Sequence, residues 1–223
     1  TVLRVFNASG IVVSPPAVKP RPANIELFVE TDQRTVYAMK YSGGELEDLT
    51  YVAEHITEPL VKEAHVVRLP SLSFAFVVVL QDGTAAVCTF NRASQIRAWW
   101  RLTTDGTIIG AAVIDTVLYL AVTRSTGTYL EKLPMTETGR VYVDAAITKS
   151  ATYTTVTGLA HLEGKEVNVL VDGALQSNKT VISGQIVLDG SGTSAVIGLP
   201  YTAKATTLPP ECLCAQLLEN YNI

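Results

Sequence analysis

The stretch from residue 157 to residue 201, TGLAHLEGKEVNVLVDGALQSNKTVISGQIVLDGSGTSAVIGLPY, is a series of short apolar segments separated by glycine-containing turns. Within it, Val167, Val169 and Val171 occur at every second position, so the three valines share one face of their segment. A period of two with many β-branched residues is typical of a strand and not of a helix. The stretch therefore predicts an all-β chain.

Three earlier units repeat one pattern, in which an apolar segment, a polar turn and a second apolar segment follow one another. They span residues 25–41, 74–90 and 117–133, and residues 96–102 and 107–114 read as further strands between them. Their comparable positions, Phe28, Val77 and Leu118, lie 49 and 41 residues apart. Irregular repeats of this length built from short strands are typical of propeller blades. We therefore predict partial β-propeller-like blades, too few to close a ring, followed by a small β-sandwich- or barrel-like module.

Local signals divide the chain into four parts. We predict a proline-rich linker or strap over residues 1–23, the blade-like β region over 24–134, the small β module over 135–208 and a C-terminal tail over 209–223. Residues 48–56 predict a short helix with Asp48 as its N-cap. Asp-Gly pairs at residues 82–83, 172–173 and 189–190 predict tight turns. The first residue is Thr1 and not Met, which indicates a fragment or a processed chain.

The composition excludes several classes of function. The formal net charge is −4 and the sequence pI about 5.4, and no segment carries the clustered Lys and Arg of a nucleic-acid platform. No apolar run approaches the length of a membrane helix, and no signal peptide opens the chain. Three cysteines form no disulfide framework, which indicates assembly in a reducing compartment.

Several segments resemble a known family of phage proteins. Residues 24–56 (NIELFVETDQRTVYAMKYSGGELEDLTYVAEHI) and 77–114 (VVVLQDGTAAVCTFNRASQIRAWWRLTTDGTIIGAAVI) are similar to the nozzle, or tail tubular protein B, family of T7-like short-tailed bacteriophages. The runs TTVTGLAHLEGKEVNVLVDGA and VIGLPYTAKATTLP resemble the downstream β module of that family. The resemblance covers roughly residues 24–208 and departs at both ends of the chain.

The resemblance implies a structural component of the virion. Nozzles of this family are ring-shaped homo-oligomers, usually hexamers, that hang below the portal and adaptor and form the conduit through which the genome leaves. Their sides help to dock tail fibres. The resemblance thus implies a protein assembled in the host cytoplasm that contacts copies of itself, adaptor or portal proteins and tail fibres. DNA would pass without specific binding, and the net charge of −4 predicts a slightly acidic channel. The family carries no catalytic motif, so the resemblance implies no enzyme, no cofactor and no metal.

An arginine- and tryptophan-rich segment is the main candidate for an interaction site. No acidic residue occurs between Asp82 and Asp105, and alternation over residues 96–102 puts Arg97, Trp99 and Arg101 on one face. A tryptophan on a polar face favours a contact with another protein. Two other interpretations stay open: a core Trp99 with solvated arginines, or direct stacking on nucleic acid.

Other candidate chemistry is weakly supported by the sequence. The histidines at 55, 65 and 161 have no metal-ligand spacing, and Cys212-Leu213-Cys214 is not a C-x-x-C motif. A glycan-binding β module on a host surface is the alternative function, with an exposed Trp99 as its one indication. A hydrolase on a propeller scaffold would need a carboxylate pair, for which Asp105, Asp115 and Glu131 are the nearest candidates without supporting spacing.

Overall fold

The computed structural model describes residues 11–12, 25–30, 32–40, 46–51, 53–70, 73–91, 93–136, 142–152 and 154–204. These residues form several antiparallel sheets, so the all-β prediction is confirmed. Within these ranges the only helical elements are two short 3-10 turns, η1 (Glu54–Ile56) and η2 (Ala160–Leu162), and none is long and apolar enough to cross a membrane. The described strands do not close into a barrel or a complete propeller.

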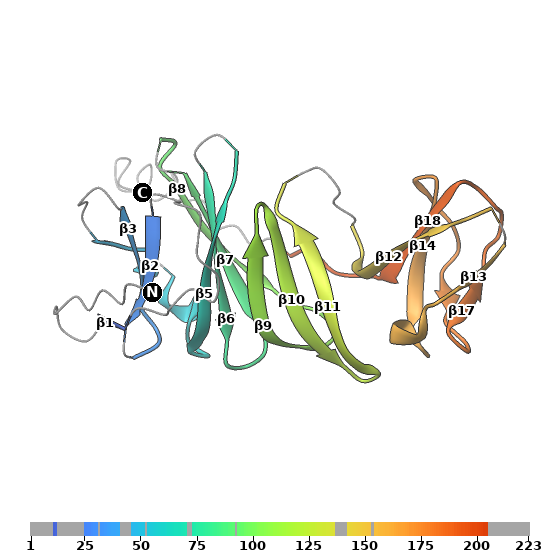
Figure 1. The fold of residues 1–223 in the computed structure, drawn as a ribbon, viewed down its shortest axis with the longest axis horizontal. Helices are drawn as coiled ribbons and strands as arrows, with labels where there is room; N and C mark the ends of the chain where they lie inside the picture. The colour runs from blue at the N-terminus through green and yellow to red at the C-terminus, as the bar shows by residue number, and fades with distance from the viewer. Residues whose placement is uncertain are drawn as a thin grey trace, which may run out of the picture.

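Three sheets follow one another along the first part of the chain, each with its strands in sequence order (Figure 1). The first sheet contains β1 (Ile11–Val12), β2 (Ile25–Glu30), β3 (Val36–Lys40) and β4 (Leu46–Asp48). The second sheet contains β5 (Val61–Arg68), β6 (Phe74–Leu80), β7 (Ala85–Asn91) and β8 (Ile96–Leu102). The third sheet contains β9 (Thr107–Ile114), β10 (Val117–Arg124) and β11 (Gly127–Pro134). The three hairpins expected from the sequence are thus confirmed as β2–β3, β6–β7 and β10–β11.

The second sheet is covered on both faces, which explains its nearly continuous apolar strands. One face, with Phe76 and Val78 of β6, packs against buried residues of the first sheet such as Val36. The opposite face, with Val77 and Val79, packs against the third sheet. All residues from Ala75 to Leu80 are at most 1% exposed. The three sheets therefore stack through two apolar cores that share the second sheet.

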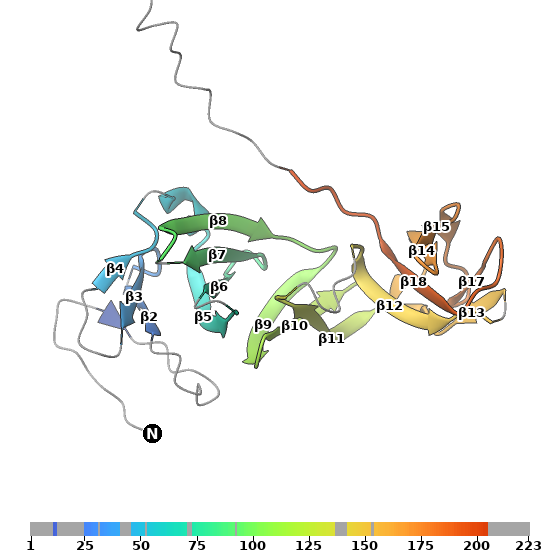
Figure 2. The same ribbon diagram turned by 90° about the horizontal axis from the view of Figure 1, so that it is seen from above.

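The C-terminal module has a core of its own. It contains β12 (Asp144–Ser150), β13 (Thr155–Thr157), β14 (Glu166–Val171), β15 (Ala174–Leu175), β16 (Lys179–Thr180), β17 (Gln185–Val187) and β18 (Ser194–Leu199). Val167, Val169 and Val171 point into this core, as their alternation predicts. None of the residues of this core belongs to the two cores of the sheets. Figure 2 shows the module at the far end from the first sheet.

Two local predictions are wrong. Residues 48–56 do not form a helix capped by Asp48: β4 ends at Asp48, and only η1 is helical. The Asp48 carboxylate accepts hydrogen bonds from the backbone N–H groups of Thr50 (2.8 Å) and Tyr51 (3.0 Å), the donors that an N-cap would bind, but here these bonds hold a turn, which Asp stabilises in the same way. The pair at residues 189–190 has no positive φ and is not a tight turn of the expected kind.

The other two Asp-Gly pairs do turn the chain. Asp172 and Gly173 have φ of 48° and 82°, as a two-residue hairpin turn requires. At residues 82–83 only Gly83 has a positive φ (82°), so this hairpin has a longer connection than expected. The predicted strap over residues 1–23, apart from β1, and the predicted tail over 209–223 lie outside the described residues.

Candidate functional site

The three residues predicted as an interface, Arg97, Trp99 and Arg101, all reach from β8 to the first sheet and the turn that follows it. Arg97 donates from Nη1 to the backbone oxygen of Asp48 (2.8 Å) and forms an ion pair with Glu47. Arg101 donates from Nη2 to the backbone oxygen of His55 at 3.0 Å. The alternation that put these side chains on one face is therefore confirmed, and the face is a contact between two sheets of the same chain.

Trp99 is a packing residue of this contact. Its indole Nε1 donates to the backbone oxygen of Leu49 at 2.7 Å, and its ring packs on the core between the first and second sheets. The exposed tryptophan of β8 is Trp100, which is 39% exposed on the opposite face. Trp99 is therefore not the exposed aromatic residue on which the prediction of glycan binding depends. Contact of Arg97, Trp99 and Arg101 with another protein stays a prediction.

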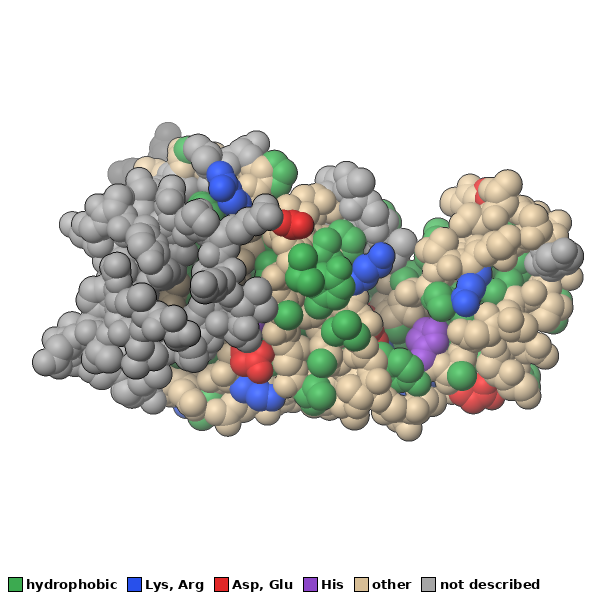
Figure 3. Space-filling view, in the orientation of Figure 1, with side chains coloured by type: hydrophobic (Ala, Val, Ile, Leu, Met, Phe, Trp, Pro, Cys, Tyr) green, Lys and Arg blue, Asp and Glu red, His purple; other side chains and the backbone are tan. Residues whose placement is uncertain are grey.

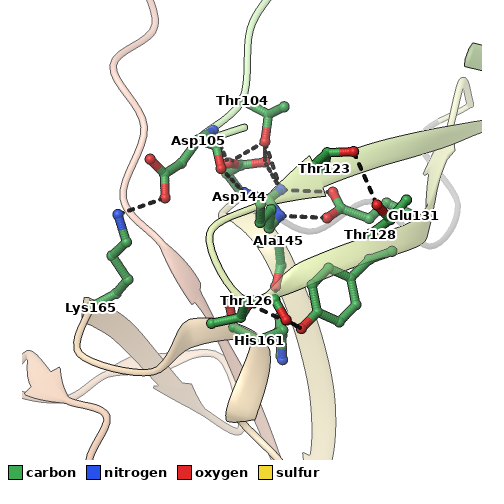
Figure 4. A network of polar contacts seen from close by, with 12 residues as sticks. Thr104, Asp105, Thr123, Thr126, Thr128, Glu131, Asp144, Ala145, His161 and Lys165 are labelled. Carbon is green, nitrogen blue, oxygen red and sulfur yellow. Dashed lines mark hydrogen bonds and ion pairs between the residues drawn. The ribbon is translucent and has the colours of Figure 1, made fainter. Parts of the chain in front are cut away.

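A second polar cluster, which includes Thr104, Glu131 and Asp144, joins the third sheet to the C-terminal module (Figure 4). Arg124 lies at its centre. The Arg124 side chain is only 3% exposed. It donates from Nε and Nη2 to the two carboxylate oxygens of Glu131 (2.7 and 2.9 Å) and from Nη1 to the backbone oxygen of Asp105 (2.6 Å). A planar guanidinium matches a carboxylate in this two-bonded way.

The same guanidinium binds the start of the module. Arg124 Nη2 donates to Thr104 Oγ1 at 2.7 Å and lies 3.7 Å from Asp144, the first residue of β12. Thr104 in turn donates to both carboxylate oxygens of Asp144, at 2.9 and 2.7 Å. Burial alone would lower the pKa of Arg124, but the hydrogen bonds and charge of Glu131, with Asp144 and Asp105, raise it, so the group stays charged.

Weaker contacts extend this joint along the module. Lys165 pairs with Asp105 at 2.9 Å near the surface, and Thr126 donates to the backbone oxygen of His161 at 3.3 Å. The ring of Tyr129 lies against the His161 ring, with centroids 5.9 Å apart. These contacts, together with the Arg124 cluster, are called the polar joint below. It is built almost wholly from polar groups, in contrast to the apolar cores on either side.

Comparison with known proteins assigns the chain to no group: no family model matches it, and no curated protein is similar to it in sequence.

The residues considered for catalysis serve structural contacts. Glu131 and Asp105 belong to the polar joint, and Asp115 is exposed in the β9–β10 turn with a φ of 55°. In the described part of the chain, no three His, Cys, Asp or Glu residues come together as metal ligands, and every buried polar side-chain atom has a partner.

A shallow hollow of about 240 Å³ lies beside the first sheet. Two carboxylates of its lining are engaged by the chain itself. Asp32 accepts hydrogen bonds from the backbone of Arg34 and Thr35, and Asp48 from that of Thr50.

Sequence reasoning missed the polar joint. In the unit over residues 117–133 the sequence predicts RSTG as the polar turn, which begins at Arg124, whereas β10 continues through Arg124 and its guanidinium is buried. A signal was present: on either side of the turn, Arg124 and Glu131 fall on the inward face that Leu118, Leu120 and Val122 define by alternation. Opposite charges at two inward positions indicate a buried ion pair.

Proposed function

We propose that this chain is a structural, non-enzymatic component of a bacteriophage tail nozzle, forming part of the ring-shaped conduit for genome ejection. The observation that carries the proposal is the row of small antiparallel sheets stacked face to face in chain order. Together with the resemblance of residues 24–208 to the nozzle family, this arrangement supports a wall-like role.

The finer architecture that we propose is a partial β-propeller followed by a small β-sandwich- or barrel-like module. Two features support it. The first and second sheets are four-stranded meanders, the form of a propeller blade. The first strands of the second and third sheets, β5 and β9, lie beside each other, and Lys62 donates to the backbone oxygen of Ile109 at 2.6 Å across them. Adjacent first strands are expected where blades meet near an axis.

The mechanical role fits the way the parts are joined. A conduit wall has to keep its shape while DNA passes. Two apolar cores fix the three sheets, and the buried Arg124 and its partner Thr104 link them to Asp144 at the start of the C-terminal module. The partners in this proposal are other copies of the chain in a hexameric ring, adaptor or portal proteins, and tail fibres. The location is the virion, after assembly in the host cytoplasm.

Electron microscopy of the purified chain tests the proposal. We expect ring-shaped particles with six-fold symmetry and a central hole. A monodisperse monomer at high protein concentration would contradict it. Because the net charge is −4, we also expect no retardation of duplex DNA in an electrophoretic mobility assay near physiological salt. Tight DNA binding would contradict a conduit that lets DNA pass.

A further inference from the structure

The outward face of the third sheet is apolar and exposed. Its inward face is buried against the second sheet, but Leu130, Ile114 and Ile109 on the other side are 73%, 57% and 43% exposed. Figure 3 shows hydrophobic side chains gathered over β9, β10 and β11. Contiguous exposed apolar patches mark contacts with other molecules more often than free surface.

The sequence of β10 indicates a strand that is covered on both faces. Residues 117–122 (VLYLAV) form a continuous apolar run like that of β6 (FAFVVVL). In β6 such a run is buried on both faces by two neighbouring sheets. In β10 only alternate residues, Leu118, Leu120 and Val122, are buried. The two strands thus have the same kind of apolar sequence, but β6 is packed on both faces and β10 on only one.

The register gives the shape and charge of this face. Its cross-strand rows run through Ile114, Val117 and Pro134, through Ala112, Tyr119 and Lys132, and through Gly110, Ala121 and Leu130. The small residues Gly110, Ala112 and Ala121 gather at one corner of this face, where the carboxylate of Glu63 from β5 lies beside Gly110. Lys132 is exposed, and the strands place no acidic residue at these outward positions.

The described part of the outward side of the first sheet, at the other end of the stack, carries acidic residues. In β3, Val36 and Ala38 point to the core, so Tyr37 points outward, opposite Asp48 of β4. Glu30 follows the inward Val29 and is also outward. Burial raises the pKa of Tyr37, as do the charges of Glu30 and Asp48, so these acids lie close to the tyrosine.

We propose that a second copy of this chain packs the outward side of its first sheet against the outward face of the third sheet. Such a contact continues the existing order of the stack, first sheet to second to third, and brings Lys132 toward the acidic side of the next copy. It is head-to-tail, so each copy uses two different surfaces, as ring closure requires. This inference rests on the proposed function and names the surface by which that ring would form.

Complementation between two variants of the full chain tests the inference. Leu130→Asp puts a charge on the third-sheet face, and Glu30→Lys with Tyr37→Lys reverses the charge of the first-sheet side. Each variant alone is expected to self-associate at least about ten-fold more weakly than the natural sequence in sedimentation velocity, since one buried leucine accounts for such a factor. Mixed together, the two variants retain one intact pair of surfaces and should form a dimer. Leu175→Asp, at a 68% exposed leucine in the C-terminal module, is the matched control and should associate normally.

The possible results distinguish failure of the proposed contact surface from failure of the proposed nozzle function. Rings that persist in Leu130→Asp would overturn this inference and leave the nozzle proposal standing. A natural-sequence chain that stays monomeric would overturn both. Loss of association in Leu130→Asp with normal self-association of the Glu30→Lys, Tyr37→Lys variant would show a contact between two third-sheet faces and would overturn the head-to-tail arrangement, as would the absence of a dimer in the mixture. Circular dichroism of every variant establishes that it is folded.

Discussion

Replacing Arg124 by methionine is the sharpest test of the polar joint. The methionine keeps much of the apolar stem and removes the guanidinium. Four hydrogen bonds of 2.6–2.9 Å disappear with it: two to Glu131, one to Thr104 and one to the backbone of Asp105. The carboxylates of Glu131 and Asp144 then remain without the cation between them.

The size of the expected loss of stability depends on how far Glu131 and Asp144 are buried. Removing one member of a buried ion pair costs about 3–5 kcal/mol, because the other charge stays desolvated. The Glu131 and Asp144 side chains are 25% and 23% exposed, so water reaches them in part and the lower end applies. We therefore expect Arg124→Met to lower the free energy of unfolding by about 3 kcal/mol. Arg124→Met combined with Glu131→Leu should lose less than the sum of the two single changes, because no charge of that pair is left unpaired.

Urea unfolding followed by tryptophan fluorescence measures this effect. Both tryptophans lie on β8, two and three residues from the Leu102–Thr104 segment that leads to the joint. With a slope of about 1–3 kcal/mol per molar urea, the midpoint should fall by roughly 1–3 M. Lys165→Met is the matched control: its pair with Asp105 is exposed, at 43% and 52%, and should contribute about 0–1 kcal/mol. If Arg124→Met and Lys165→Met shifted the midpoint equally, the reasoning that places the stability of the joint in a buried guanidinium would be refuted.

Three further predictions concern single side chains. Trp99→Ala should lower the free energy of unfolding by about 3–5 kcal/mol, and Trp100→Ala by less than half as much, because only Trp99 is packed between sheets; equal losses in equilibrium unfolding would contradict this. Burial raises the pKa of the Cys88 thiol to about 12, so in a variant whose other two cysteines are serine a thiol reagent at pH 8 should react only on unfolding; rapid labelling of the native protein would show the opposite. Hydrogen bonds from Lys179 and Ser177 lower the pKa of Asp189 from 3.8 to about 2, so its stabilising effect is present above about pH 4 and lost as the pH falls through about 2. Asp189→Asn should flatten the acid limb of the stability–pH curve in that range, and an unchanged limb would count against these bonds.

The fold was predictable where one local pattern decides it. The alternation of Val167, Val169 and Val171 has a single strand-like solution, and the structure adopts it. The hairpins at β2–β3, β6–β7 and β10–β11 follow likewise from apolar segments on either side of polar turns. The helix expected over residues 48–56 failed because Asp48 can cap a turn as readily as a helix, and the propensity of a short segment does not choose between them.

The candidate sites were less predictable because they depend on contacts between distant segments. Alternation grouped Arg97, Trp99 and Arg101, but nothing in seven residues indicates that their partner is the turn around Leu49, about 50 positions earlier. Both faces of β8 carry large side chains, so periodicity alone does not say which one is covered. Arg124 is bound by groups from three places in the chain, at residues 104–105, 131 and 144, and only the folded arrangement brings them together.

Because the second sheet is packed on both faces, one of its faces stays exposed during synthesis until the third sheet has been made. β6 ends at Leu80, whereas the last strand of the sheet that covers Val77 and Val79 ends at Pro134, 54 residues later. At about 5–20 residues per second, a nascent chain would spend about 3–10 s with this valine-rich side exposed at the ribosome. An apolar β-strand left open for that time is prone to pair with neighbouring chains. The same stacking that gives the finished protein its rigidity thus makes its synthesis the stage at which it is most vulnerable to aggregation.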